Sequence, residues 1–289
     1  SPRQLREICV LAMGEFGKIK LMYGPESDRP LAVKTLSKQY LLRRGDQACY
    51  MEERDALVAN RGNRWIPQLE QALQDEEFLH LVMEYAPGGD LLGLLARQEH
   101  AVISEADARF YMAELIMALH TLHQTGFVHR DVKPGNVLIA ADGHVKLADF
   151  GSCARMGPSG LVLSSVSVGT PDYVSPEVLR AQENAGGTSA TYGCECDWWS
   201  VGVLLYECLY GDPPFAGDTL LDTYNRVMHH QRYLVFPDDE DVEVSDAAKD
   251  LIRRLLCDRE TRIGLSGVEE IQQHPFFAGV NWEQLHTSR

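Results

Sequence analysis

The sequence predicts an α+β fold built from two lobes. Short apolar runs broken by glycines fill the first third of the chain, a pattern typical of β-strands, and helical periodicity dominates the remainder. Between the two parts, Pro87-Gly88-Gly89 marks a break that would serve as a hinge. We therefore expect one domain over residues 1–289, with an N-terminal lobe at 1–85 and a C-terminal lobe at 86–289.

The first lobe is expected to consist of strands with one main helix. Turn residues at 24–28 separate two of the strands, and Gly62 would end the helix. The predicted elements are strands at 8–13, 17–23, 31–36 and 78–84, with the helix at 46–60.

The second lobe is expected to be mostly helical. Ser104 followed by Asp107 resembles a capping box in which Asp replaces the usual Glu or Gln, and the helix it starts would end at Gly126. Asp197 would cap a helix that runs to Tyr210 and is apolar all round, as a buried helix is. The other predicted features are a strand pair at 137–139 and 145–148, amphipathic helices at 245–256 and 266–274, and exposed insertions at 181–191 and 237–244.

Composition and charge restrict the class of partner. The net charge of −15 argues against binding to nucleic acid or anionic membranes and suits cationic partners, although simple solubility explains it equally well. The seven cysteines are scattered, without a Cys-x-x-Cys pair, which favours free thiols in a reducing compartment. The apolar run at 201–205 is far too short to span a membrane. We therefore expect a cytoplasmic protein.

Two features of the first lobe could handle phosphate groups. Gly14 and Gly17 lie between predicted strands, where glycines let backbone N–H groups approach phosphate oxygens, although such a hairpin is more often only a turn. Lys34 follows Ala32-Val33 inside an apolar strand, so its charge needs an anionic partner unless it faces solvent at an edge. Glu53, on the predicted helix, could supply that partner.

The second lobe contains the decisive stretch, His129-Arg130-Asp131-Val132-Lys133-Pro134-Gly135-Asn136, followed by Asp149-Phe150-Gly151. Asp131 can accept a hydroxyl proton, and Lys133 can neutralise a phosphoryl group in transfer. Asn136 and Asp149 offer hard oxygen ligands suited to Mg²⁺. These are the groups that phosphoryl transfer requires, and their order makes a charged surface loop an inadequate explanation.

These residues match the signature set of protein kinases, and the chain resembles that family from about Leu11 to Phe277. Lys-Pro-x-Asn and Gly169-Thr170-Pro171 resemble serine/threonine kinases rather than tyrosine kinases. The segments FLHLVMEYAPGGD, GTPDYVSPE, DWWS and HPFF look like the AGC group. EERD and DFGSC most resemble its myotonic-dystrophy-kinase branch, which includes the Rho- and Cdc-type GTPase effector kinases and citron kinase.

The resemblance implies a bilobal kinase fold, with an antiparallel sheet in the first lobe, that binds ATP and Mg²⁺. Glu177 would pair with Arg262, and Asp197 would brace the catalytic loop. The implied roles are catalysis by Asp131, Lys133 and Asn136, metal binding by Asn136 and Asp149, substrate binding by Asp90, Thr170 and Glu207, and ATP binding by Leu11, Gly14, Gly17, Ile19, Ala32, Lys34, Glu53, Met83, Glu84, Ala86, Asp90 and Leu138.

The resemblance also implies substrates and partners. Protein segments with basic residues before a Ser or Thr would be phosphorylated, in cytoskeletal or actomyosin regulation. A Rho-family GTPase or a dimerisation partner would act through regions outside this chain, in a cytoplasmic, cytoskeleton-associated setting. Neither nucleic acid nor a membrane span is implied.

Several positions depart from the family pattern. Ala12 replaces the first glycine of the phosphate loop, Gly135 stands where an acidic residue is usual, and Val166 occupies the place of a phosphorylated threonine. The AGC tail is absent, so we expect this domain to come from a longer protein. A pseudokinase scaffold and a small-molecule phosphotransferase remain as alternatives.

Overall fold

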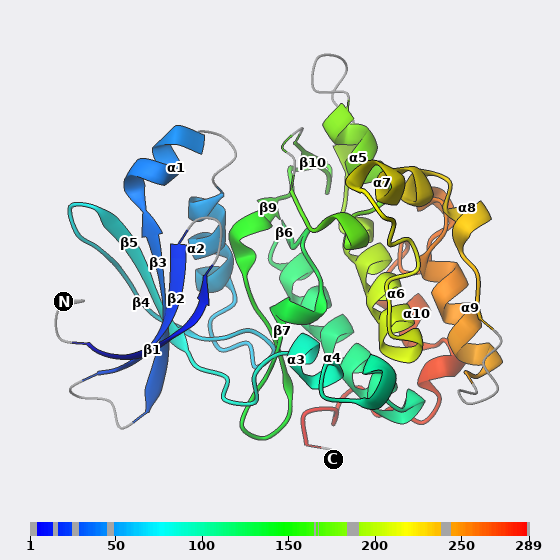
Figure 1. Cartoon of the computed structure of the whole chain (residues 1–289), viewed down its shortest axis with the longest axis horizontal. Coiled ribbons are helices and arrows are strands. Elements are labelled where there is room, and N and C mark those ends of the chain that lie inside the picture. Colours follow the sequence, from blue (N-terminus) through cyan, green and yellow to red (C-terminus); the bar gives the residue numbers. More distant parts are fainter. Residues whose placement is uncertain are drawn as a thin grey trace.

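The computed structural model describes residues 5–13, 17–24, 29–44, 49–164, 166, 168–183, 191–237 and 244–287. A sheet forms one end of the molecule and a group of helices forms the other, so the two lobes lie side by side (Figure 1). The predicted α+β class is therefore confirmed.

The first lobe contains a five-stranded antiparallel sheet in the order β1-β2-β3-β5-β4. Its strands are β1 (Arg6–Met13), β2 (Gly17–Tyr23), β3 (Pro30–Ser37), β4 (Leu69–Gln74) and β5 (Phe78–Glu84). The four predicted strands are present, and β4 is an addition. Its alternation is weak, because it contains only one fully buried position, Leu69.

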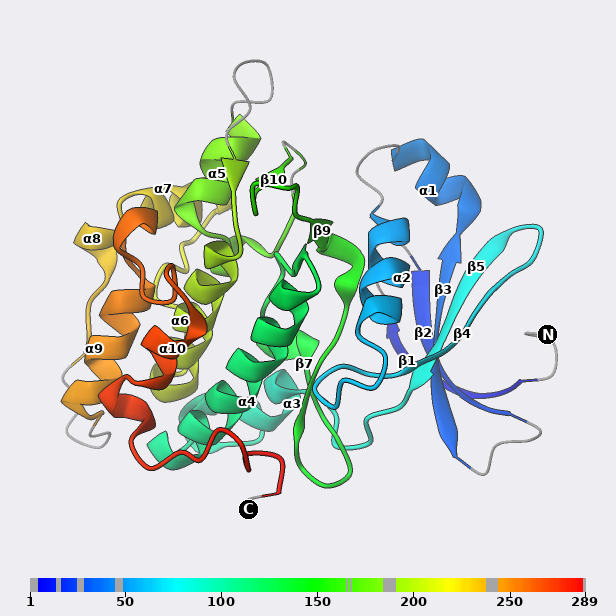
Figure 2. The ribbon, with the colours of Figure 1, turned by 180° about the vertical axis from the view of Figure 1, so that it is seen from behind.

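Two helices accompany this sheet: α1 (Lys38–Arg44) and α2 (Tyr50–Ala59). The prediction of one helix from residue 46 was therefore wrong at its start, since α2 begins at Tyr50. Glu53, Ala56 and Leu57 form the buried side of α2. In both views this helix lies between the sheet and the second lobe (Figures 1 and 2), which positions Glu53 near the junction of the lobes.

The second lobe is mostly helical, and its apolar core is centred on α4 and α6. Its helices are α3 (Leu91–Leu95), α4 (Glu105–Gln124), α5 (Pro176–Glu183), α6 (Glu195–Tyr210), α7 (Leu220–Met228), α8 (His230–Tyr233), α9 (Asp246–Leu255) and α10 (Val268–Gln272). Its short strands pair as β6 (Phe127–Val128) with β9 (Ala154–Arg155), β7 (Val137–Ile139) with β8 (Val145–Leu147), and β10 (Val162–Leu163) with β11 (Thr191–Tyr192).

Helix caps largely follow the sequence. The Ser104 hydroxyl accepts from the Asp107 backbone N–H and starts α4, and Ser245 caps α9 in the same way. The prediction for Asp197 was wrong: α6 begins at Glu195, so Asp197 lies inside its first turn. Its carboxylate is used elsewhere, as described below. Parts of both predicted insertions, at 184–190 and 238–243, lie outside the described residues.

None of the helices in the described part of the chain combines the length and the apolar character that crossing a membrane requires.

Candidate active site

Lys34 forms a buried ion pair that joins the two lobes. It lies on β3, and its Nζ donates to Glu53 Oε1 at 2.6 Å and to Asp149 Oδ1 at 2.8 Å. Burial alone would lower the pKa of Lys34, but the two carboxylates outweigh that effect and the pKa is raised. Lys34 is therefore charged at neutral pH, and the predicted pairing with Glu53 is present.

Asp149 follows β8 in a backbone conformation that L-residues rarely adopt, with φ 60° and ψ 77°. Its Oδ1 also accepts from the Gly151 N–H at 3.4 Å, while 43% of the side chain is exposed. The charge of Lys34 lowers the pKa of Asp149 to about 2, against the opposing effect of burial. An ionised carboxylate is thus held at a fixed place with part of its surface open.

Asp131, Lys133 and Thr170 form a closed polar cluster. Thr170 Oγ1 donates to Asp131 Oδ1 at 2.7 Å and accepts from Lys133 Nζ at 2.7 Å. Lys133 Nζ also lies 2.9 Å from Asp131 Oδ2. The structure therefore brings together two predicted catalytic residues and one predicted substrate-binding residue, although Thr170 lies far along the chain from the other two.

Asn136 completes this cluster and leaves an oxygen available. Its Nδ2 donates to the Asp131 carbonyl oxygen at 2.7 Å and to Asp131 Oδ2 at 3.1 Å. Because the amide nitrogen makes these bonds, Asn136 Oδ1 is the atom left to accept a further partner. The hairpin of β7 and β8 connects Asn136 to Asp149, and the Ala148 N–H donates to the Asn136 carbonyl at 2.9 Å. An amide oxygen and an ionised carboxylate at the two ends of one hairpin suit the preference of Mg²⁺ for oxygen.

Asp197 fixes the backbone of the catalytic loop, the stretch from His129 to Asn136. Its Oδ2 accepts from the His129 N–H at 2.9 Å, and its Oδ1 accepts from the Arg130 N–H at 2.8 Å. His123, at the end of α4, contacts the same carboxylate through Nε2 at 2.8 Å. Burial would lower the pKa of His123, but hydrogen bonds to Asp197 and Cys194 raise it to about 9. The bracing predicted for Asp197 is thus present, strengthened by an imidazolium that the sequence did not reveal.

The residues predicted to contact adenine come from several strands. Ala32 of β3 lies opposite Met83 of β5, and Ile19 of β2 lies opposite Lys34. Leu138 of β7 forms a backbone bridge with Asp90. Ala32, Met83, Ile19 and Leu138 are only partly buried, whereas Leu11 is 41% exposed beside a register shift in β1. The strand register therefore places Ile19, Ala32 and Met83 on one side of the five-stranded sheet, whereas Leu138 belongs to the separate β7–β8 pair.

The hinge residues lie within the described part of the chain, as does Gly17 of the phosphate loop. Glu84 ends β5 and its carboxylate lies 3.0 Å from Lys146 Nζ, and Ala86 is buried just after it. Gly17 begins β2 so close to β3 that a Cβ would lie 1.8 Å from the Thr35 carbonyl oxygen, which only glycine avoids. Gly14 lies outside the described residues.

The other predicted substrate residues, Asp90 and Glu207, have internal partners. Asp90 caps α3 and accepts from the Gly93 N–H at 2.7 Å. Glu207 of α6 accepts from the Tyr173 hydroxyl at 2.5 Å. Burial raises the pKa of Glu207 to about 7, and the nearby Asp212 and Asp172 raise it further against the effect of the Tyr173 bond.

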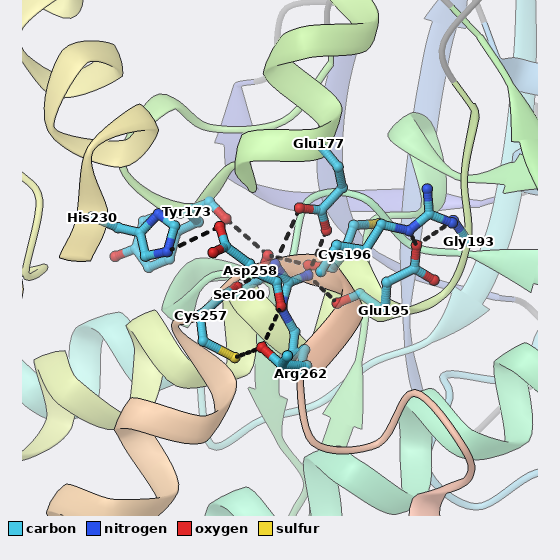
Figure 3. Close-up of polar contacts among 12 residues, drawn as sticks. Tyr173, Glu177, Gly193, Glu195, Cys196, Ser200, His230, Cys257, Asp258 and Arg262 are labelled. Carbon is cyan, nitrogen blue, oxygen red and sulfur yellow. Dashed lines mark hydrogen bonds and ion pairs between the residues drawn. The ribbon is translucent and has the colours of Figure 1, made fainter.

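Glu177 and Arg262 form the buried pair shown in Figure 3, where the carboxylate and the guanidinium point at one another. One bond joins Nη1 to Oε1, and Nη2 donates to Oε2 at 3.1 Å. Arg262 also donates to the Glu195 carbonyl at 2.8 Å and lies 5.2 Å from the centre of the Trp199 ring. Helix α5, which follows the Thr170 segment, is thereby fixed to α6 and the chain after α9.

The family model described as "Protein kinase domain" matches residues 6–277. The chain belongs to this family. Protein kinases transfer phosphoryl groups from ATP, so the cluster around Asp131 and the Lys34 ion pair lie in a kinase domain.

Named relatives narrow the branch of the kinase family. The chain is 50% identical over 279 residues to mouse (Mus musculus) serine/threonine-protein kinase MRCK gamma, covering 96% of this chain and 18% of that protein. It is 48% identical to human (Homo sapiens) MRCK alpha and to rat (Rattus norvegicus) MRCK beta, each over 96% of this chain and 16% of the relative. These are myotonic dystrophy kinase-related kinases, so the branch predicted from the motifs is confirmed. The chain spans less than a fifth of their length.

Three contacts of this kinase site were not predicted from the sequence. They are the His123 contact to Asp197, the Tyr173 bond to Glu207, and a hydrogen bond from Arg130 to Tyr192. His123 directly follows Leu122 near the end of α4, and no local motif distinguishes it from a solvent-facing histidine. Each contact joins segments at least 34 residues apart, which local patterns do not connect.

Proposed function

We propose that this chain is a serine/threonine protein kinase that transfers the γ-phosphoryl group of Mg-ATP to proteins. The observation that carries the proposal is the cluster in which Asp131 contacts Thr170, Lys133 and Asn136 through its carboxylate. A carboxylate with such fixed partners is suited to orient a hydroxyl group and accept its proton.

Each remaining step of phosphoryl transfer has a candidate residue. Lys133 would neutralise the group in transfer, and Lys34, held by Glu53, would contact the ATP phosphates. Asn136 and Asp149 would hold Mg²⁺, which neutralises phosphate charge when bound. Adenine would lie against the apolar surface of Ile19, Ala32, Leu138, Leu11 and Met83, with backbone contacts to Glu84 and Ala86 at the hinge.

We propose that substrates carry basic residues before the target Ser or Thr. Asp90 and Glu207 would contact these side chains, with an arginine three residues upstream favoured and one two residues upstream favoured less. The preference is graded because Gly135 lacks a carboxylate. A Cβ at Gly135 would meet nothing within 4 Å, so Gly135→Glu would add a carboxylate without disturbing the loop.

The cellular role is proposed from the relatives. The myotonic-dystrophy-kinase branch includes Rho- and Cdc-type GTPase effector kinases, so we propose that a Rho-family GTPase or a dimerisation partner acts through segments beyond this chain. Substrates would then belong to the cytoskeleton or the actomyosin system in the cytoplasm.

Radiolabel transfer from ATP to a mixed peptide array tests these proposals together. The chain should label Ser and Thr peptides with upstream arginines, Asp149→Ala should label none, and Gly135→Glu should sharpen selection for the nearer arginine. Charge-assisted contacts contribute roughly 1.5–3 kcal/mol each, so each preference should exceed about tenfold. A wild-type chain that labels no more peptide than Asp149→Ala does would indicate a scaffold. An unchanged peptide preference in Gly135→Glu would refute the substrate model.

A further inference from the structure

Every nitrogen of the Arg130 guanidinium is bound inside the protein. Nε donates to the Ser152 carbonyl at 2.6 Å, and Nη1 donates to the Tyr192 hydroxyl at 2.9 Å. Nη2 lies 3.4 Å from the Cys153 carbonyl and 3.6 Å from Cys49 Sγ on the first lobe. Arg130 is only 6% exposed, so no solvent shell competes with these partners. Tyr192 is the partner of Arg130 that comes from β11.

Tyr192 connects this arginine to the activation segment, which we define as residues 149–177. Tyr192 belongs to β11 and pairs in register with Val162 of β10, within that segment. Its side chain is fully buried, and the Ser164 hydroxyl also hydrogen-bonds to its phenol oxygen. One phenol oxygen therefore meets the catalytic loop on one side and the activation segment on the other.

Asp131, whose carboxylate we propose to react, is the residue after Arg130. A shift of the Arg130 backbone would therefore also move Asp131. Arg130 adopts φ 68°, a conformation that L-residues occupy only when their surroundings hold them there. Its carbonyl oxygen also lies close to the activation segment, since a Cβ added at Gly169 would come within 2.8 Å of it. Backbone and side chain of Arg130 are thus clamped from several directions, and Tyr192 supplies the clamp on Nη1.

We propose that Tyr192 is a positioning residue for phosphoryl transfer: its phenol oxygen holds Arg130 against the activation segment and thereby orients Asp131. The proposal rests on the kinase function proposed above. Tyr192 holds the Arg130 guanidinium from within the fold; without it, an anionic group from elsewhere would be required to hold that side chain. It touches neither substrate nor nucleotide and acts only through Arg130.

The test compares Tyr192→Phe with Tyr206→Phe in the whole chain. Both variants remove one phenol oxygen that forms a hydrogen bond within the second lobe, because Tyr206 of α6 donates to the Val235 carbonyl at 2.9 Å and is not among the partners of Arg130 given above. Tyr192→Phe should lower kcat on an arginine-containing peptide by about tenfold or more, with KM for ATP unchanged, because the lost bond has a charged donor. Tyr206→Phe should keep the wild-type kcat, although its loss of thermal stability should be similar to that of Tyr192→Phe.

A double-mutant cycle with Arg130→Lys separates positioning from general destabilisation. A lysine cannot bind Tyr192 and the Ser152 carbonyl in the same forked geometry, so the two substitutions should be strongly non-additive in kcat. Additive effects, or a Tyr192→Phe kcat within about threefold of wild type, would overturn the proposal. An inactive wild-type chain in the same assay would instead refute the proposed kinase function.

Discussion

At the residue scale, the geometry of Asp131 assigns its two carboxylate oxygens different neighbours. Oδ1 accepts from Thr170, whereas Oδ2 faces Lys133 and Asn136. None of these partners takes part in the separate Lys34 ion pair, which lies between the lobes. Chemistry at Asp131 and nucleotide binding at Lys34 are therefore expected to be separable by mutation.

Asp131→Asn should lower kcat by roughly 10²–10⁴, because an amide cannot accept the hydroxyl proton, while the affinity for ATP stays the same. Steady-state kinetics on an arginine-containing peptide, with ATP binding measured by calorimetry, checks both parts. Asp142→Asn is the matched control: it removes the same charge from an exposed turn and should leave kcat unchanged. An Asp131→Asn kcat within threefold of wild type, with chemistry rate-limiting, would refute the role.

The motif residues around Asp131 could be predicted because they are contiguous and each carries its own chemistry. Asp197 shows the opposite case. Its position before an apolar run suggested a helix cap, but its carboxylate is drawn to two backbone N–H groups of the catalytic loop. A cap and a tertiary acceptor have the same local signature, so only the packing of α4 against α6 distinguishes them.

At the element scale, α4 and α6 are linked through this carboxylate. His123 lies in the last turn of α4 with its side chain 9% exposed, and Asp197 in the first turn of α6 is fully buried. The raised pKa of His123, about 9, means that the folded chain holds this proton more tightly than the unfolded chain does. The resulting stabilisation is complete below pH 6.5 and disappears as the pH rises through about 9.

We predict that the stability difference between the wild type and His123→Gln shrinks by about 3 kcal/mol between pH 6 and pH 10. Urea denaturation of both proteins across that range measures it. His120→Gln on the same helix is the control, because burial lowers the pKa of His120 and confines its titration to lower pH. Parallel stability curves for the wild type and His123→Gln above pH 7 would contradict the assignment.

At the scale of the whole molecule, the activation segment has attachments at both ends. Arg130 and Tyr192 hold its first part through β10 and β11, and Glu177 with Arg262 holds its last part. Breaking a buried pair such as Glu177–Arg262 by removing one partner costs about 3–5 kcal/mol. The middle of the segment, around the half-buried Val166 and Val168, lies between these anchors.

Such anchoring predicts activity without phosphorylation of the activation segment. Val166 cannot carry a phosphate, and the guanidinium of Arg130 already has its partners within the fold. Ser164, and Ser165 and Ser167 outside the described residues, are the nearby hydroxyl groups that could serve instead. We expect the fold to hold the segment, with control exerted by dimerisation or docking of parts beyond this chain.

Phosphatase treatment of the full-length protein tests that expectation. Protein shown by mass spectrometry to be unmodified at Ser164, Ser165 and Ser167 should retain most of its peptide-kinase activity, because no phosphate is needed to order the segment. A Ser164→Ala variant provides the control, since it removes the serine that hydrogen-bonds to Tyr192 and should behave like the treated wild type. A large loss of activity that returns when one of these serines is phosphorylated again would show that a phosphate, rather than the buried anchors, orders the segment.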